Sequence, residues 1–193
     1  MCQMLNAYFR YLFFLPLNFL FMLVCLILNP LVIFFIREDG TFPPFLRWFE
    51  TWDARHLFFD GSGEIQADWL DIHWKFLRPL LPYPKIHLYL CRLLWLYRNC
   101  GYGFAYYVCG ADYDRHSVIS RTYTSPEGLL DIYMESYSDE VFRRSGFYPY
   151  KLFNYKFGFD YYLGWKLQAG TGESDGRTRA MIAMRINPFK GAD

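Results

Sequence analysis

The sequence predicts an α+β protein with a long apolar helix at its N-terminus, a short helical connector and a C-terminal antiparallel β-sheet. Three observations predict this class. No charged residue occurs between Tyr11 and Ile36, prolines and glycines interrupt the middle of the chain, and apolar residues occupy every odd position from Phe153 to Leu167. The expected divisions are residues 1–36 for the tail and apolar helix, 37–110 for the connector and 111–193 for the sheet.

The composition excludes two broad classes of protein. Hydrophobic residues make up 53% of the 193 residues, and the formal net charge is only +1. A disordered chain would need low hydrophobicity and high net charge. A nucleic-acid-binding chain would be expected to show a basic excess, so no nucleic-acid partner is expected.

The run from Tyr11 to Ile36 predicts a retained single-pass membrane anchor. A spanning helix needs about 20 apolar residues, and Pro16 suits the first position of a helix because its missing N–H costs nothing there. A cleaved signal peptide would have a shorter core and a small-residue cleavage site. The remaining alternative is an interfacial or re-entrant hairpin broken at Asn29 and Pro30, where the proline would free backbone carbonyls that Asn29 could help to satisfy.

Basic residues and cysteines favour a cytoplasmic C-terminal domain. Arg10 precedes the apolar run, whereas Arg37, Arg47 and Arg55 follow it. Loops rich in Lys and Arg stay on the cytoplasmic side. The cysteines match neither a CxxC metal clip nor an even-numbered disulfide framework, which favours reduced thiols. They are Cys2, Cys25, Cys91, Cys100 and Cys109.

The connector carries an aromatic cluster and two expected helices. The cluster comprises Phe42, Phe45, Trp48, Phe49 and Trp52, and it fits either the headgroup level of a membrane or packing against the folded domain. Apolar periodicity predicts a helix over 64–78 and another over 86–98. Arg92 and Arg98 argue against a second span, so the second helix is expected to be buried or to lie on a membrane surface.

Alternating patterns predict two hairpins in the C-terminal half. The first joins strands at 118–124 and 129–137, and the second joins 153–167 to 178–186. A strand as long as 153–167 is unusual, so we expect Gly158 or Gly164 to bend or bulge it.

Several motifs suggest chemistry only weakly. Asp60 to Gly63 resembles part of a calcium loop but lacks oxygen ligands at its ends, because Phe58 and Trp69 stand there. Asp68, Asp71 and His73 form one local cluster without a second ligand group, and the other histidines (His56, His87 and His116) are scattered. The Gly170–Gly176 loop resembles a phosphate-binding loop in its glycines, but it joins two expected strands, whereas a phosphate-binding loop lies between a strand and a helix. We therefore expect no metal and no cofactor.

One constellation remains a candidate binding site, in which basic residues interleave with aromatic ones. Such a surface stacks bases or meets anionic headgroups, although an ordinary sheet with one packed and one solvated face has the same pattern. The candidate residues are Arg143, Arg144, Tyr148, Tyr150, Lys151 and Lys156, flanked by Phe153, Tyr155 and Lys166.

Several landmarks occur in the order found in one known family. They are Leu28-Asn29-Pro30, Trp48 to Asp53, Trp95 to Phe104, Gly164-Trp165-Lys166, and the tail from Thr178 to Lys190. The chain resembles a family of small, uncharacterised proteins of tailed bacteriophages. It departs from that pattern at Trp52 and Cys100, where proline is expected. The resemblance implies a phage context and a host-membrane location, and it implies no activity.

The leading hypothesis for function is therefore non-catalytic. It describes a phage-encoded protein anchored in the host inner membrane that binds a host or phage protein, or anionic lipid headgroups. One alternative is a virion component that enters the cell envelope during genome delivery. Another is a membrane-tethered enzyme acting on lipid or nucleic acid through Asp53, Asp60, Asp68 or His73.

Overall fold

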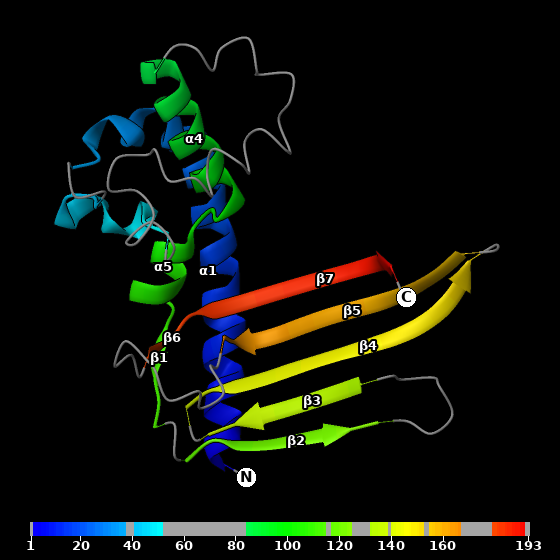
Figure 1. The fold of residues 1–193 in the computed structure, drawn as a ribbon. Coiled ribbons are helices and arrows are strands. Elements are labelled where there is room, and N and C mark those ends of the chain that lie inside the picture. The colour runs from blue at the N-terminus through cyan, green and yellow to red at the C-terminus, as the bar shows by residue number, and fades with distance from the viewer. Residues whose placement is uncertain are drawn as a thin grey trace. The chain divides into compact units, whose positions relative to one another are not determined.

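The computed structural model describes residues 2–37, 41–51, 84–114, 117–124, 132–138, 140–152, 155–166 and 179–191. It divides the chain into two compact units (Figure 1). The first unit contains residues 1–16 and 109–193, and the second contains residues 17–108. The predicted α+β class is confirmed, since a long apolar helix precedes short helices and a C-terminal antiparallel sheet. The predicted helix over 64–78, the calcium-like loop and Trp52 lie outside the described residues.

The N-terminal helix α1 runs from Cys2 to Val32, followed by the 3-10 helix η1, Ile33–Phe35. The prediction that the helix starts at Pro16 is wrong, because Pro16 lies in its interior. A proline inside a helix removes one backbone hydrogen bond and costs roughly 3 kcal/mol. The N-terminal turns of α1 pack against the rest of the first unit, and these contacts offset the cost of Pro16.

The second unit packs short helices against its part of α1. They are the 3-10 helix η2 (Pro44–Phe49), α4 (Pro84–Arg98) and α5 (Tyr102–Tyr107), and α4 confirms the helix predicted over 86–98. The predicted aromatic cluster divides between two environments. Phe42 and Phe49 join Val32, Ile33 and Leu96 in the buried core, whereas Phe45 and Trp48 are exposed.

Two glycines allow the turn between α4 and α5 to approach its neighbours closely. Gly101 has a φ of 74°, which favours glycine, and a Cβ there would lie 2.8 Å from the side chain of Met22. A Cβ on Gly103 would lie 2.5 Å from the carbonyl oxygen of Arg47. Gly101 and Gly103 therefore stand where any larger side chain would meet neighbouring atoms.

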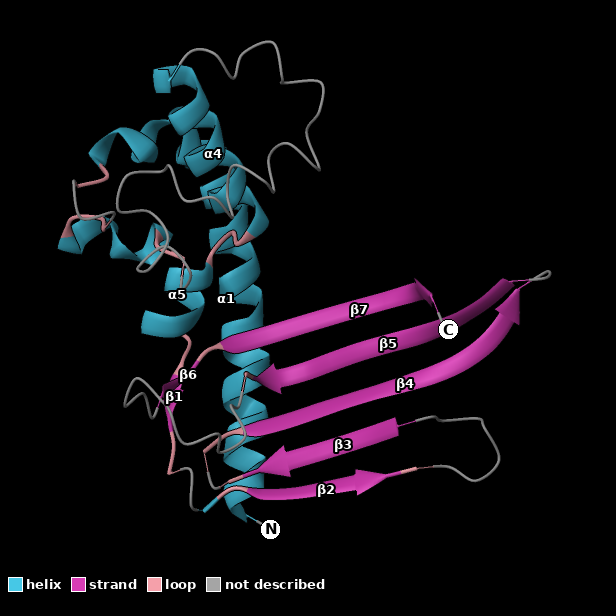
Figure 2. Ribbon diagram, in the orientation of Figure 1, coloured by secondary structure: helices cyan, strands magenta, loops and turns pink. Residues whose placement is uncertain are grey.

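The first unit contains a five-stranded antiparallel sheet in the order β2-β3-β4-β5-β7 (Figure 2). The first predicted hairpin is confirmed, since β2 pairs with β3. The second is confirmed in its pairing of β5 with β7, but its second strand begins at Ile182, because Arg179 and Ala180 of the predicted strand pair with β1 (Ala111–Asp112) instead. The central strand β4 was not predicted, because Gly146 and Pro149 obscure its alternation. Pro149 pairs with Gly158 of β5, and the described part of β3 pairs with β4 from Phe142 to Phe147. The bounds are Ile119–Tyr123 for β2, Ile132–Tyr137 for β3, Phe142–Leu152 for β4, Tyr155–Trp165 for β5 and Ile182–Gly191 for β7.

Both glycines expected to perturb the long strand do so. The register between β5 and β7 shifts between Gly158 and Asp160. Gly164 adopts a φ of 112°, and a Cβ there would lie 2.1 Å from the carbonyl oxygen of Phe142. Glycine therefore permits the close approach of β5 to the start of β4.

Candidate functional site

In each unit, α1 has one face packed against protein and one face exposed. Within the first unit, Ala7 and Tyr11 are buried. Within the second unit, the buried positions of α1 are Asn18, Cys25, Asn29 and Val32. We call the opposite side the outer face of α1. Its members in the second unit are Leu20, Leu23, Ile27, Leu31 and, in η1, Phe34, which are 57–75% exposed.

The polarity of α1 is the reverse of that in a water-soluble helix. Every exposed side chain of α1 from Leu12 to Val32 is apolar, whereas Asn18 and Asn29 are buried at 8% and 1% exposure. A helix at a water-facing surface places its polar residues outward and its apolar stripe toward the core. Because α1 does the opposite, its outer face is suited to an apolar environment. The helix is also long and apolar enough to cross a membrane by length and composition.

A proline inside α1 is compensated by a tyrosine of α4. Pro30 has no N–H, so the carbonyl of Leu26 lacks its usual helical donor. The Tyr97 hydroxyl donates to that oxygen at 3.2 Å. The expectation that Asn29 satisfies the freed carbonyl is wrong, because the donor comes from a neighbouring helix. The Tyr89 hydroxyl donates to the carbonyl of Pro30 itself, also at 3.2 Å.

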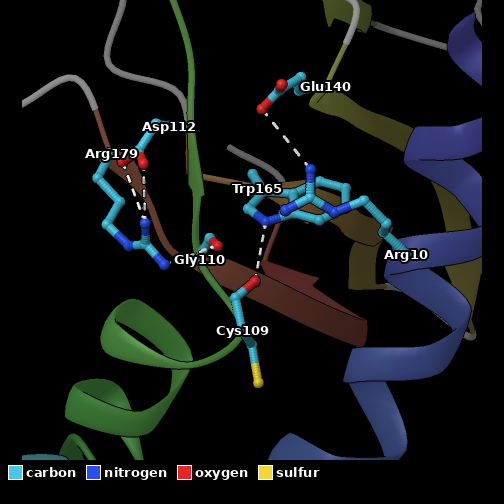
Figure 3. A network of polar contacts seen from close by, with 7 residues as sticks. All are labelled: Arg10, Cys109, Gly110, Asp112, Glu140, Trp165 and Arg179. Atoms are coloured by element: carbon cyan, nitrogen blue, oxygen red, sulfur yellow. Dashed lines mark hydrogen bonds and ion pairs between the residues drawn. The ribbon is translucent and has the colours of Figure 1, made fainter.

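One end of the sheet is covered by the first turns of α1. Tyr11 makes edge contacts with Phe142 and Trp165 at centroid distances of 5.2 and 5.6 Å, and its hydroxyl donates to the carbonyl of Ala183. Trp165 is fully buried, and its indole N–H donates to the carbonyl of Cys109 at 3.3 Å (Figure 3). These contacts fix the N-terminal turns of α1 on the covered end of the sheet.

Charged pairs flank this covered end (Figure 3). Arg179 donates to both carboxylate oxygens of Asp112 at 3.1 Å and to the carbonyl of Gly110 at 3.0 Å. These contacts support a small sheet formed by β1 (Ala111–Asp112) and β6 (Arg179–Ala180). Arg10, the charged residue of α1, lies 3.6 Å from Glu140.

The same side of the sheet continues beyond the covered end as an aromatic face. Directly paired residues share a face, which places Tyr148 with Phe159 and Tyr150 with Phe157. We call this surface the aromatic face; its residues are Tyr148, Tyr150, Phe157, Phe159, Tyr161 and Phe189. Neighbouring rings lie 6.0–6.5 Å apart, and Tyr148 and Phe189 are 39% and 63% exposed.

The opposite side of the sheet is cationic. It carries Arg143, Lys151, Lys156, Arg185 and Lys190, which we call the cationic face. Among the described strand residues, the carboxylate on this side is Asp160. Asp160 is only 7% exposed and lies 2.7 Å from Arg185 and 3.8 Å from Lys190. Arg143 stacks over the ring of Tyr162, and Lys190 lies over the ring of Phe147.

The predicted basic and aromatic constellation therefore divides between two faces. Tyr148 and Tyr150 lie on the aromatic face, whereas Arg143, Lys151 and Lys156 lie on the cationic face. Arg144 shares the aromatic side but donates twice to one carboxylate oxygen of Glu135, at 3.0 and 2.8 Å. Lys166 is exposed at the end of β5. The separation follows from alternation along β4, which sequence reasoning missed because it did not recognise that strand.

Four cysteines, Cys25, Cys91, Cys100 and Cys109, are buried thiols. Burial raises the pKa of the Cys91 thiol to about 11 and that of Cys109 to about 12. Both groups therefore stay protonated and weakly nucleophilic at neutral pH. Cys100 stands where the family-like pattern has proline, and its thiol donates to the carbonyl of Met22 at 3.3 Å. Within the described ranges, no three His, Cys, Asp or Glu side chains gather to hold a metal ion.

The fold and these surfaces define an α+β protein with an outward-facing apolar helix and an open aromatic sheet. A model for a family of unknown function (DUF7338) matches residues 2–193. The chain therefore belongs to that family. No curated protein and no solved structure shows significant similarity to it.

Proposed function

We propose that this protein is a membrane-attached, non-catalytic binding protein held at the bilayer by the outer face of α1. The reversed polarity of that helix carries the proposal. Leucine, isoleucine and phenylalanine point away from the protein, and both asparagines between Leu12 and Val32 point into it. Monomeric soluble proteins rarely expose an apolar surface of this extent without a lipid or protein partner.

The proposed membrane is the inner membrane of a bacterial host, in the phage context that the sequence resemblance implies. The sequence alone predicts that α1 crosses this membrane once, whereas the contacts of the second unit favour a helix that lies in the interface. In both geometries we propose that the C-terminal domain lies in the cytoplasm. The helix's length of 31 residues and its high mean hydropathy of 2.5 support membrane attachment.

Flotation of the full chain with liposomes tests the attachment. The key variant is Ile27→Lys, because Ile27 is 75% exposed on the outer face. The matched control is Ile186→Lys, which adds the same charge at a 53% exposed sheet position. The proposal predicts that the wild type and the control float with the lipid and that Ile27→Lys floats less. Equal flotation of the two variants, or a wild type that stays in the soluble fraction without detergent, would contradict it.

We propose a protein partner for the aromatic face of the sheet. Tyrosine and phenylalanine provide large, rigid contact areas and are enriched in the centres of protein interfaces. The exposed rings of Tyr148 and Phe189 supply such an area on a flat strand surface. The cationic face is the surface that anionic lipid headgroups would contact instead.

A photo-crosslinking residue separates these two kinds of partner. It is placed at Tyr148 on the aromatic face and, as the matched control, at Lys151 on the cationic face of the same strand. A discrete protein adduct from position 148 that is missing from position 151 supports the proposal. Lipid adducts alone, or identical protein adducts from both positions, would refute it.

A further inference from the structure

We propose that α1 lies in the plane of the membrane interface, with its outer face in the acyl–headgroup boundary, and does not cross the bilayer. This inference rests on the proposed membrane attachment and specifies its geometry. In each unit taken by itself, the polypeptide packs against one side of α1 and leaves the other side for the bilayer.

The contacts of the second unit oppose a transmembrane orientation. Tyr97 donates to the carbonyl of Leu26, and Cys100 donates to the carbonyl of Met22, so α4 runs antiparallel beside α1. Tyr89 extends this contact to Pro30. A helix that crosses the bilayer between Tyr11 and Ile36 would therefore carry α4 into the hydrocarbon with it.

The basic residues of α4 make that position costly. Leu26 lies near the middle of the uncharged run, so the exposed Arg98, next to Tyr97, would lie near the bilayer centre. Arg92 is six residues away, about 9 Å along the helix. An arginine at the bilayer centre costs about 2.5–3.5 kcal/mol on insertion scales. An in-plane helix avoids this cost because α4 then stays on the aqueous side.

Within the first unit, the N-terminal turns of α1 pack against the sheet, so they are not free to form part of a membrane span. Tyr11 contacts Trp165 and the carbonyl of Ala183, and the Cys109 thiol lies 3.8 Å from the carbonyl oxygen of Phe14. A span that included these turns would draw the covered end of the sheet into the hydrocarbon. The remaining stretch of α1 is the one that α4 contacts.

The length of α1 agrees with an in-plane position. Its 31 residues measure about 46 Å, against about 30 Å of hydrocarbon. A crossing would use only about 20 of these residues, so about a third of the helix would lie outside the hydrocarbon. A helix that lies in the interface meets no such limit.

The width of the exposed surface favours lipid over a second copy of the chain. Leu26, Ile27 and Leu28 are consecutive and are 49%, 75% and 37% exposed. Three consecutive residues cover about 200° of a helix, because each residue turns it by about 100°. A two-helix seam buries a narrower stripe at heptad positions and leaves the remainder wet. A lipid surface covers the whole arc.

Labelling of single cysteines in oriented membrane vesicles tests the geometry. Asn6 and Arg37 are exposed and lie at opposite ends of the apolar helix. Each is changed to cysteine, as Asn6→Cys or Arg37→Cys, in a Cys2→Ser background of the full chain. Right-side-out and inside-out vesicles are then treated with a membrane-impermeant maleimide, and the Cys2→Ser parent controls for the native thiols.

The in-plane geometry predicts that both positions label in one vesicle orientation and that neither labels in the other. Labelling of the two positions from opposite sides would overturn the in-plane geometry and leave membrane attachment intact. Recovery of the protein in the soluble fraction would overturn both proposals. A dimeric mass by light scattering in that case would assign the outer face to a second copy.

Discussion

The hydrogen bond from the Tyr97 hydroxyl to the Leu26 carbonyl supports a quantitative prediction about how α1 tolerates Pro30. The change is Tyr97→Phe, which removes the hydroxyl and keeps the ring. Because Pro30 has no N–H, the Leu26 carbonyl then loses its donor. On a helix surface covered by lipid, leaving a backbone acceptor without a donor costs about 1–3 kcal/mol.

Tyr89→Phe is the matched control, because Tyr89 also donates to a carbonyl of α1 at the same distance of 3.2 Å. The residues after Pro30 have backbone N–H groups that can donate to the Pro30 carbonyl. The hydrogen bond from Tyr89 is therefore an additional bond to that oxygen. We expect that control to cost about 0.5–1.5 kcal/mol, the net value of an ordinary hydrogen bond.

A double-mutant cycle isolates the effect of the proline. Pro30→Ala restores an N–H that can bond to Leu26, so Tyr97→Phe should cost less in that background than in the wild type. The assay is denaturant unfolding in lipid micelles, followed by near-ultraviolet circular dichroism. An equal cost of Tyr97→Phe in both backgrounds, or a cost no greater than that of Tyr89→Phe, would refute the reasoning.

Three further predictions concern the sheet and the thiols. Gly164→Ala should destabilise the first unit by about 2–6 kcal/mol, because the alanine would have a strained φ and its Cβ would overlap a backbone oxygen. Gly146→Ala is the control and should cost about 1 kcal/mol, because its Cβ meets the movable ring of Tyr161. Thermal unfolding compares the two variants, and equal melting temperatures would contradict the role given to Gly164. Iodoacetamide at pH 8 should leave Cys91 and Cys109 unmodified in the native protein and modify both after unfolding, with peptide mass spectrometry as the readout, and rapid native labelling would show that they are not buried. Burial raises the pKa of these thiols from 9.0 to about 11 for Cys91 and about 12 for Cys109, so above pH 9 the native state keeps protons that the unfolded state loses. The free energy of unfolding is therefore unaffected below about pH 9 and falls between pH 9 and 12. The fall should be shallower in Cys109→Ala, and an unchanged pH profile in that variant would refute the linkage.

The elements that the sequence predicted well are those whose pattern repeats without interruption. The alternation from Phe153 to Leu167 corresponds to β5, and both hairpins pair as expected. Strand β4 was missed because Pro149 and Gly146 are ordinarily signs against a central strand. The pairing of β4 with both β3 and β5 is a tertiary fact that the local sequence does not contain.

The candidate surfaces were predictable only in part, for a related reason. The apolar run identified α1, but nothing in its composition separated a buried face from an exposed one. The outer face is as apolar as any core, and the faces differ through the inward direction of Asn18 and Asn29. The basic and aromatic residues were found, but their separation onto two faces depends on the unrecognised strand β4.

Spin-label accessibility along the outer face of α1 tests the central claim most directly. Nitroxides are placed in turn at Leu20, Ile27 and Leu31 of the full chain in liposomes, with Ile186 on the sheet as the aqueous control. The account predicts that the three helix positions are accessible to oxygen, shielded from a water-soluble nickel complex and similar in depth, while position 186 is open to nickel. Nickel accessibility along the helix equal to that at position 186 would contradict the claim that lipid covers the outer face of α1.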